Sequence, residues 1–172
     1  MKTKTLIFLF VALFVFLSWS EGHSLCNTRN PLFRIERSKN ENIVPYDACL
    51  LRNGNLSGSN PVDVYWILKT GKKGELNAVE KKYAYGIESN KKLGENRFRI
   101  VITALKDREI IIEKRSTDYK ALVRINGEQS IIEKVYVKSE ENFLGFPDID
   151  YVDLFGRSLK TNQLVKERIT PR

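Results

Sequence analysis

The chain contains a single histidine, His23, among its 172 residues. It stands close to the N-terminus, ahead of every segment whose pattern predicts a strand or a helix. Ser-His-Asp and Cys-His catalysis both need an imidazole as their base, so the sequence excludes these mechanisms. The composition therefore favours a protein that binds over one that catalyses.

Recognisable metal and phosphate sites are also missing. Zinc sites need several His or Cys ligands close together, and the sequence has no such group. Asp148, Asp150 and Asp153 place three carboxylates in one segment, but the glycine-containing loop of a calcium site does not accompany them, and we interpret them as solvated. No glycine-rich phosphate loop occurs. We therefore expect neither a metal nor a cofactor.

Long apolar runs are limited to one, from Leu6 to Leu17, which follows Lys2 and Lys4 and precedes Ser18-Trp19-Ser20. This order is typical of a secretory signal peptide, here residues 1–20. A membrane-spanning helix needs about 20 apolar residues, so retention as a signal anchor is the less favoured alternative. We expect a secreted or periplasmic protein.

Basic residues outnumber acidic ones and give the chain a net charge of +8. Segments such as Lys106-Asp107-Arg108-Glu109 alternate in sign, which is typical of a solvated sheet face. Nucleic-acid binders instead gather their cations on one element with aromatic residues between them, so we expect no nucleic-acid partner. Weak attraction to an anionic membrane surface or polysaccharide stays open, and salt would screen it.

Two cysteines, Cys26 and Cys49, follow the predicted signal peptide. An even pair in an oxidising compartment usually forms a disulfide, and closing this loop would contribute about 3 kcal/mol. The alternative is a lipoprotein acylated at Cys26, but Leu25 is bulkier than the residue expected before a lipidated cysteine. We therefore predict a disulfide that ties the N-terminal segment to the first hairpin.

Apolar and polar residues alternate through most of the chain from Leu32 onward, which is the period of a half-buried strand. Short polar turns join these segments. The pattern predicts a mainly β protein, an antiparallel meander that closes into a barrel-like or sandwich domain with one short helix. We expect residues 21–31 to be a flexible N-terminal segment and residues 32–170 to form a single β-rich domain, with a loop over residues 89–96.

The predicted helix covers residues 76–85, where the alternation breaks. Leu76, Val79 and Tyr83 recur there at helical spacing, and we expect this apolar stripe to pack against the sheet. Gly86 stands where helices often end in a left-handed conformation.

A series of short motifs extends over the first half of the chain. The motifs are Arg34-Ile35-Glu36-Arg37-Ser38-Lys39-Asn40, Tyr46-Asp47, Pro61-Val62, Tyr65-Trp66 and Ala84-Tyr85-Gly86. On these motifs, from about Leu32 to Ile169, the chain resembles an uncharacterised exported bacterial family, the domain of unknown function 4833. The resemblance implies membership of that family and an exported location. It implies no activity, because none is established for the family.

Eight residues in and around these motifs are candidates for a binding site. They are the aromatic residues Tyr46, Tyr65, Trp66 and Tyr85 and the polar residues Glu36, Arg37, Asn40 and Asn42. The former offer apolar faces with a polar group, and the latter offer directional hydrogen bonds. We expect them to line the mouth of the barrel and hold a small ligand. In the structural alternative, Trp66 fills the core, Arg37 pairs with Glu80 or Asp47, and the asparagines shape a turn.

Three functional hypotheses follow from this pattern. The leading one is a secreted or periplasmic binding domain for a small amphipathic ligand or an envelope component. The second is a structural or protein-interaction module of the cell envelope that uses a sheet face, which a filled interior would favour. The third is a carboxylate-dependent hydrolase, with Glu36, Asp47, Asp63 and Glu80 as candidate acids.

Overall fold

Strands make up 64% of the residues described by the computed structural model, which are 26–141 and 147–170. The predicted signal peptide, residues 1–20, and His23 lie outside the described residues. The elements are β1 (Thr28–Arg37), β2 (Asn40–Leu50), β3 (Val62–Ile67), β4 (Lys73–Glu75), α1 (Ala78–Glu80), η1 (Lys81–Tyr85), β5 (Ile87–Gly94), β6 (Arg97–Ile102), η2 (Thr103–Leu105), β7 (Ile110–Arg115), β8 (Asp118–Ile125), β9 (Glu128–Glu141), β10 (Pro147–Ser158) and β11 (Leu164–Ile169). The predicted mainly β class with one short helix is confirmed.

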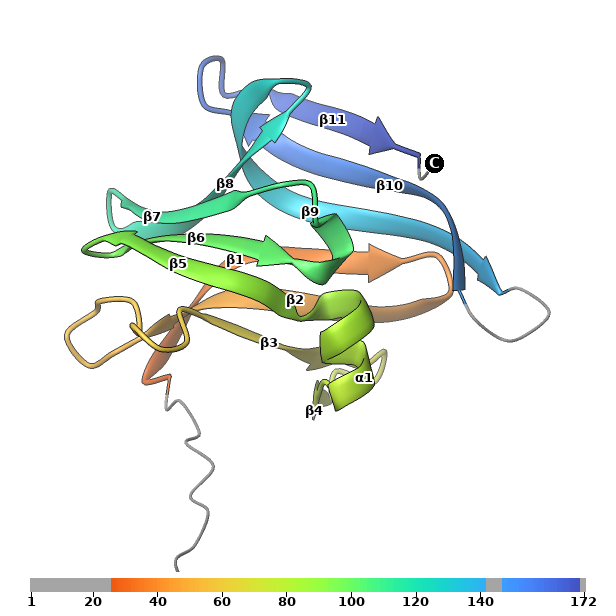
Figure 1. Ribbon diagram of the computed structural model, residues 1–172, viewed down its shortest axis with the longest axis horizontal. Helices are drawn as coiled ribbons and strands as arrows, with labels where there is room; N and C mark the ends of the chain where they lie inside the picture. The colour runs from red at the N-terminus through yellow and green to blue at the C-terminus, as the bar shows by residue number, and fades with distance from the viewer. Residues whose placement is uncertain (1–25, 142–146, 171–172) are drawn as a thin grey trace, which may run out of the picture.

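The long strand β9 is the axis of the fold (Figure 1). Its first part, Glu128 to Ile131, pairs with β8 and so carries the arm β8-β7-β6-β5. Its later part, Lys134 to Val137, pairs with β1 and carries the arm β1-β2-β3-β4. Strand β10 covers the other edge of β9 and is followed by β11. The two arms curl toward each other, and the sheet forms a half-barrel.

One pairing departs from the predicted antiparallel meander. Strands β1 and β9 run parallel, with Ile35 beside Val135 and Arg37 beside Val137, so the sheet is mixed. Every hairpin in the chain makes an antiparallel pair, but β1 and β9 are far apart in sequence, and no short turn dictates their relative direction. The alternating pattern of each strand is the same in either direction, which is why the sequence did not distinguish the two.

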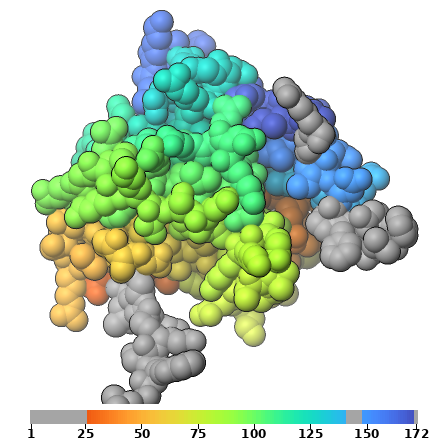
Figure 2. Space-filling model, in the orientation of Figure 1, coloured from red at the N-terminus to blue at the C-terminus, as the bar shows by residue number. Residues whose placement is uncertain are grey.

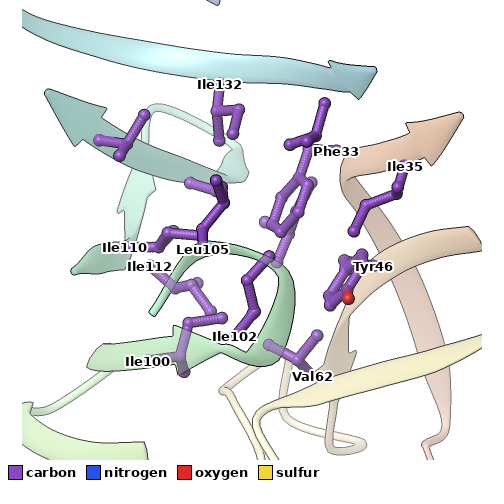
Figure 3. Close-up of a cluster of buried hydrophobic side chains, with 14 of the residues drawn as sticks. Phe33, Ile35, Tyr46, Val62, Ile100, Ile102, Leu105, Ile110, Ile112 and Ile132 are labelled. Carbon is purple, nitrogen blue, oxygen red and sulfur yellow. The ribbon is translucent and has the colours of Figure 1, made fainter. Parts of the chain in front are cut away.

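The interior of the half-barrel is filled by apolar side chains from both arms (Figure 3). Period-two alternation turns Phe33 and Ile35 inward and Arg34 and Glu36 outward. The Phe33 ring stacks on Tyr46 with centroids 4.5 Å apart. The largest completely buried side chains are Tyr46, Tyr119, Phe98, Ile35, Ile100, Ile102, Ile110, Ile112, Ile125, Ile132, Leu154 and Val44. Burial of this apolar surface is the main source of stability.

The predicted helix over residues 76–85 forms as one short turn, α1, that continues into the wider turn η1. Asn77 caps it, because its side chain accepts a hydrogen bond from the Glu80 backbone N–H while the Glu80 carboxylate accepts one from the Asn77 N–H. This reciprocal capping box fixes where the helix begins. It also holds Glu80 in place beside the sheet.

The predicted apolar stripe on this helix is only partly confirmed: Leu76 is buried in the core, but the stripe does not continue along the helix. Val79 and Tyr83 are 66% and 69% exposed, whereas Tyr85 is buried. The widened turn shifts the buried position, since π-type geometry does not keep the 3.6-residue period. The predicted left-handed cap at Gly86 was wrong, because its φ is −70°. Glycine is needed there for space: a Cβ would lie 2.0 Å from the Lys81 carbonyl oxygen.

The loop predicted over residues 89–96 was also wrong, because Ile87–Gly94 forms β5 and pairs with β6. Strand β5 ends one arm of the sheet, and its residues from Glu88 onward are exposed on both faces. An edge strand of this kind has no apolar side to reveal it by alternation.

The predicted disulfide between Cys26 and Cys49 is confirmed, with the two Cα atoms 4.9 Å apart. It secures the start of β1, which begins at Thr28 and therefore includes residues expected to be flexible. Because Cys26 is bonded to Cys49, its sulfur is not available for a lipid. Among the described residues, no helix has the length and apolar character needed to cross a membrane.

Candidate functional site

Strand β3 separates two of the predicted site residues. Tyr65 and Trp66 are neighbours in sequence, so their side chains point to opposite faces of the sheet. Trp66 is buried on the inner side, while Tyr65 lies half-buried on the outer side, where its hydroxyl donates to Asp47 Oδ2 at 2.7 Å. The eight predicted residues therefore do not form one constellation.

Four residues meet at the inner rim of the half-barrel, where side chains from β1, β3, α1 and η1 come together. We refer to Arg37, Trp66, Glu80 and Tyr85 as the Arg37 cluster. The Arg37 guanidinium carbon lies 4.8 Å from the centroid of the Trp66 ring and 5.6 Å from that of Tyr85. The two rings meet edge to face, with centroids 5.1 Å apart. The Trp66 Nε1–H donates to Glu80 Oε2 at 3.1 Å.

Arg37 forms no ion pair with a carboxylate of residues 26–141 and 147–170, and the predicted pairing with Glu80 or Asp47 was wrong. The Glu80 carboxylate is engaged by Trp66 and by the Asn77 backbone, and Asp47 by Tyr65. The Arg37 Nε is buried and has no hydrogen-bond partner. Stacking on two aromatic rings thus fixes a cation whose charge no neighbouring acid neutralises.

Tyr85 connects this cluster to the core. Burial raises the pKa of the Tyr85 phenol. The positive charge of Arg37 and the hydrogen bond between Arg37 and the phenol only partly offset this increase. The Tyr85 backbone carbonyl accepts a hydrogen bond from the Tyr46 hydroxyl. Tyr46 is completely buried, and that burial raises the pKa of its phenol. Tyr46 therefore positions Tyr85 from inside the core and does not line an accessible site.

The two predicted asparagines bind backbone groups at two different turns, Asn40 at the turn after β1 and Asn42 at the turn between β3 and β4. The Asn40 side chain accepts a hydrogen bond from the Asn42 backbone N–H at 3.2 Å, and the Asn42 side chain accepts one from the Lys69 N–H at 2.8 Å. Both oxygens are thus used for backbone groups, which is the structural role that asparagine often has in turns.

Of the four candidate acids for hydrolysis, Glu36, Asp47 and Asp63 lie on the outer face, whereas Glu80 belongs to the Arg37 cluster at the inner rim. All four are bound to donors. Burial raises the pKa of Glu36, but hydrogen bonds from Arg34 and Lys134 outweigh it and hold that pKa below its ordinary value. Asp47 and Asp63 are opposite each other on β2 and β3, with Arg29 Nε 2.6 Å from Asp63. A general acid needs the opposite shift from that of Glu36, a raised pKa.

Burial, with the hydrogen bond to Asp47, raises the pKa of Tyr65 to about 12. Lys73 lies over the same ring, with its Nζ 3.6 Å from the centroid. The predicted site residues Tyr65 and Glu36 thus belong to ionic networks of the outer face. No group of three or more metal-ligating side chains occurs in the described part of the chain.

Asp153, which we interpreted as solvated, is a buried strand residue whose side chain is only 4% exposed. Arg168 binds both of its oxygens, at 2.7 and 2.8 Å, and Lys166 Nζ lies 2.9 Å from Oδ2. These bonds, above all the one from Arg168, lower the pKa of Asp153 to about 2. The alternation of Lys166 and Arg168 on the last strand was the signal that could have revealed this pairing.

The comparisons with known proteins agree with the resemblance found in the sequence. The family model described as "Domain of unknown function (DUF4833)" matches residues 33–168, and the chain therefore belongs to this family. Neither the curated proteins nor the solved structures contain a match to the chain.

Proposed function

We propose that this protein is an exported binding domain whose Arg37 cluster holds the anionic head group of a small amphipathic ligand. The observation that supports this most strongly is the guanidinium of Arg37. It lies over the rings of Trp66 and Tyr85, it has no acidic partner among the described residues, and its Nε has no hydrogen-bond partner. An anionic ligand would supply the acidic partner that the Arg37 guanidinium does not have among the described residues.

A carboxylate or phosphate suits this site on chemical grounds. Guanidinium presents its donors in a planar fork that matches both groups, and hydrogen bonds between charged partners are about twice as strong as neutral ones. The aromatic rings restrict the side chain before a ligand arrives, so less conformational entropy is lost on binding. The Trp66 indole N–H donates a hydrogen bond to Glu80, and this bond fixes the ring on which the Arg37 guanidinium stacks.

Apolar side chains are exposed on the short helical segment that also contributes to the Arg37 cluster. The segment that contributes Glu80 and Tyr85 also exposes Val79 and Tyr83, and it projects from the body of the molecule (Figure 2). Exposed apolar side chains on a segment that also contributes to a charged cluster favour a ligand that has both characters. Because the interior is filled, we expect the ligand to lie on the rim and not within the barrel.

An exported location completes the proposal. The predicted signal peptide over residues 1–20 indicates secretion, and a disulfide such as Cys26–Cys49 persists in oxidising compartments. The ligand is accordingly expected outside the cytoplasm, where envelope components carry carboxylate and phosphate groups.

The test uses Trp66 as an internal reporter. The chain has two tryptophans, and Trp19 lies in the predicted signal peptide, so the processed protein keeps Trp66 as its only one. In the processed protein we expect hexanoate to change the fluorescence in a saturable way and hexanol to have no effect. Arg37→Met should weaken hexanoate binding at least about tenfold, since a charged hydrogen bond contributes about 1.5–3 kcal/mol.

Arg124→Met is the matched control, because Arg124 is an exposed arginine on β8 and lies outside the cluster. It should leave binding unchanged. Equal responses to hexanoate and hexanol, or equal losses in the two arginine variants, would refute the proposal.

A further inference from the structure

The outward face of β1, β9, β10 and β11 carries a second arrangement of charged and aromatic side chains. Strand register aligns Arg34, Lys134, Phe155 and Lys166 in one row across the four strands. The next row consists of Glu36, Tyr136, Asp153 and Arg168. We refer to these two rows as the basic face. At a strand spacing of about 4.8 Å, each row extends about 14 Å.

Cations on this face lie over aromatic rings. Lys134 and Lys166 lie over the ring of Phe155, with their Nζ atoms 4.7 and 5.1 Å from its centroid. The Arg168 guanidinium lies 3.6 Å from the centroid of Tyr151. Rings beneath the cations limit their conformational freedom and keep their charged ends at the surface.

Positive charge exceeds negative charge in these two rows. Glu36 is shared by Arg34 and Lys134, and Asp153 is shared by Lys166 and Arg168. Four cations thus surround two carboxylates, which leaves two positive charges. One such shared acid, Asp153, is buried, and the side chains of Lys166 and Arg168 are close to half exposed.

The positive region has clear limits along the strands. Toward one end, Glu140 is opposite Asp148, and Lys138 lies 3.8 Å from Glu140. Toward the other end, Arg157 pairs with Glu133 at 3.4 Å. The excess charge is therefore confined to the two rows, which run across the strands.

We propose that the basic face binds an acidic polysaccharide, a linear chain of sugars that carry carboxylate groups. A row of cations across four strands suits a linear chain with repeated negative charges. The aromatic rings are covered by lysine and arginine side chains and do not protrude, which suits a hydrated polymer more than the acyl region of a membrane. The Tyr136 and Tyr151 phenols are groups that can hydrogen-bond to sugar hydroxyls.

The experiment measures binding of the full chain to polygalacturonate at low salt, with dextran as the uncharged polymer. The double variant Lys134→Gln/Lys166→Gln removes two cations but leaves Arg34 on Glu36 and Arg168 on Asp153, so neither acid loses every partner. Its affinity should fall at least about tenfold. Lys91→Gln/Lys92→Gln removes the same charge from the exposed strand β5 and should reduce affinity less than about twofold.

Thermal unfolding of both double variants verifies that they fold. Wild-type binding to polygalacturonate but not to dextran, with loss only in the Lys134/Lys166 variant, would support the proposal. Equal losses in the two double variants, equal binding to dextran, or no binding by the wild type would overturn it. Stronger binding to phosphatidylglycerol vesicles than to polygalacturonate would overturn it in favour of a membrane. Arg37→Met should bind the polymer normally, so this inference can fail or succeed independently of the proposed function.

Discussion

Arg37 and Arg168 both lie over an aromatic ring, but they differ in what neutralises them. Arg168 donates two hydrogen bonds to the buried carboxylate of Asp153, whereas Arg37 has no carboxylate partner among the described residues. The first arrangement satisfies its charge within the fold. The second leaves a charge with no acidic partner in the described part of the chain, which is the basis of the proposed binding site.

Because of this difference, we expect the Asp153 network to contribute to stability and Arg37 to contribute to the proposed binding. A buried carboxylate that loses its partners is strongly destabilising, so the Asp153 network is expected to matter for folding. Arg37 pairs with no acid among the described residues, so its removal leaves no unpaired carboxylate there, and Arg37 is expected to matter little for folding. Variants on each side of the comparison test this division.

The largest effect is expected for Asp153→Asn. The amide keeps the shape but not the charge, and it can no longer accept both hydrogen bonds of Arg168 as a carboxylate does. We expect a loss of about 2–3 kcal/mol in the free energy of unfolding, near the lower end for buried pairs because Lys166 and Arg168 can regain water. Urea denaturation at pH 7 measures it.

Asp118→Asn is the control for this variant, since its carboxylate is exposed and lies 3.8 Å from Lys120. Its effect should stay below about 0.5 kcal/mol. Equal effects of the two substitutions would show that the Asp153 network does not stabilise the fold.

A second prediction concerns acid. The folded pKa of Asp153 is about 2 and its ordinary value is 3.8, so its contribution is complete above pH 4 and disappears as the pH falls toward 2. The stability gap between the wild type and Asp153→Asn should therefore narrow by about 2 kcal/mol over this range. Urea titrations at pH 5, 4, 3 and 2.5 follow the gap, and a constant gap would contradict the lowered pKa.

Trp66→Phe should have an intermediate effect. It removes the hydrogen bond from Nε1 to Glu80 and leaves space in the rim, and we expect a loss of about 1–2 kcal/mol. Trp66→Phe combined with Glu80→Gln should cost little more than Trp66→Phe alone, because their shared hydrogen bond is already absent. An additive double variant, measured by the same denaturation, would argue against that coupling.

The smallest effect on stability is expected for Arg37→Met. Loss of the ring contacts, about 1 kcal/mol, is offset by removal of a buried Nε that has no partner. The free energy of unfolding should change by less than about 1 kcal/mol. A loss similar to that of Asp153→Asn would mean that Arg37 is a structural residue.

The sequence predicted the strands well where one face is buried. Phe33 with Ile35 and Phe98 with Ile100 are pairs whose alternation directly reflects the filled interior. It failed at β5, which is exposed on both faces, and at η1, where a widened turn changed the buried position. It also could not give the direction of β1 relative to β9, because that pairing depends on distant segments.

The candidate site was predicted in part. Arg37, Trp66 and Tyr85 do meet, because three motifs from separate elements converge on the rim. Tyr65 and Glu36 were misplaced, although alternation alone puts adjacent strand residues on opposite faces and could have separated Tyr65 from Trp66. That Arg37 has no acidic partner within residues 26–141 and 147–170 could not be predicted, since distances between side chains of different elements are fixed only in the folded chain.

Nitrogen-15 spectra of the arginine Nε–H groups test the central claim most directly, because they follow Arg37 and Arg168 in one sample. On addition of hexanoate, we expect the Arg37 resonance to shift in a saturable way while that of Arg168, held by Asp153, stays in place. Hexanol should move neither. An Arg37 resonance that does not respond, or that shifts no more than that of Arg168, would contradict the account.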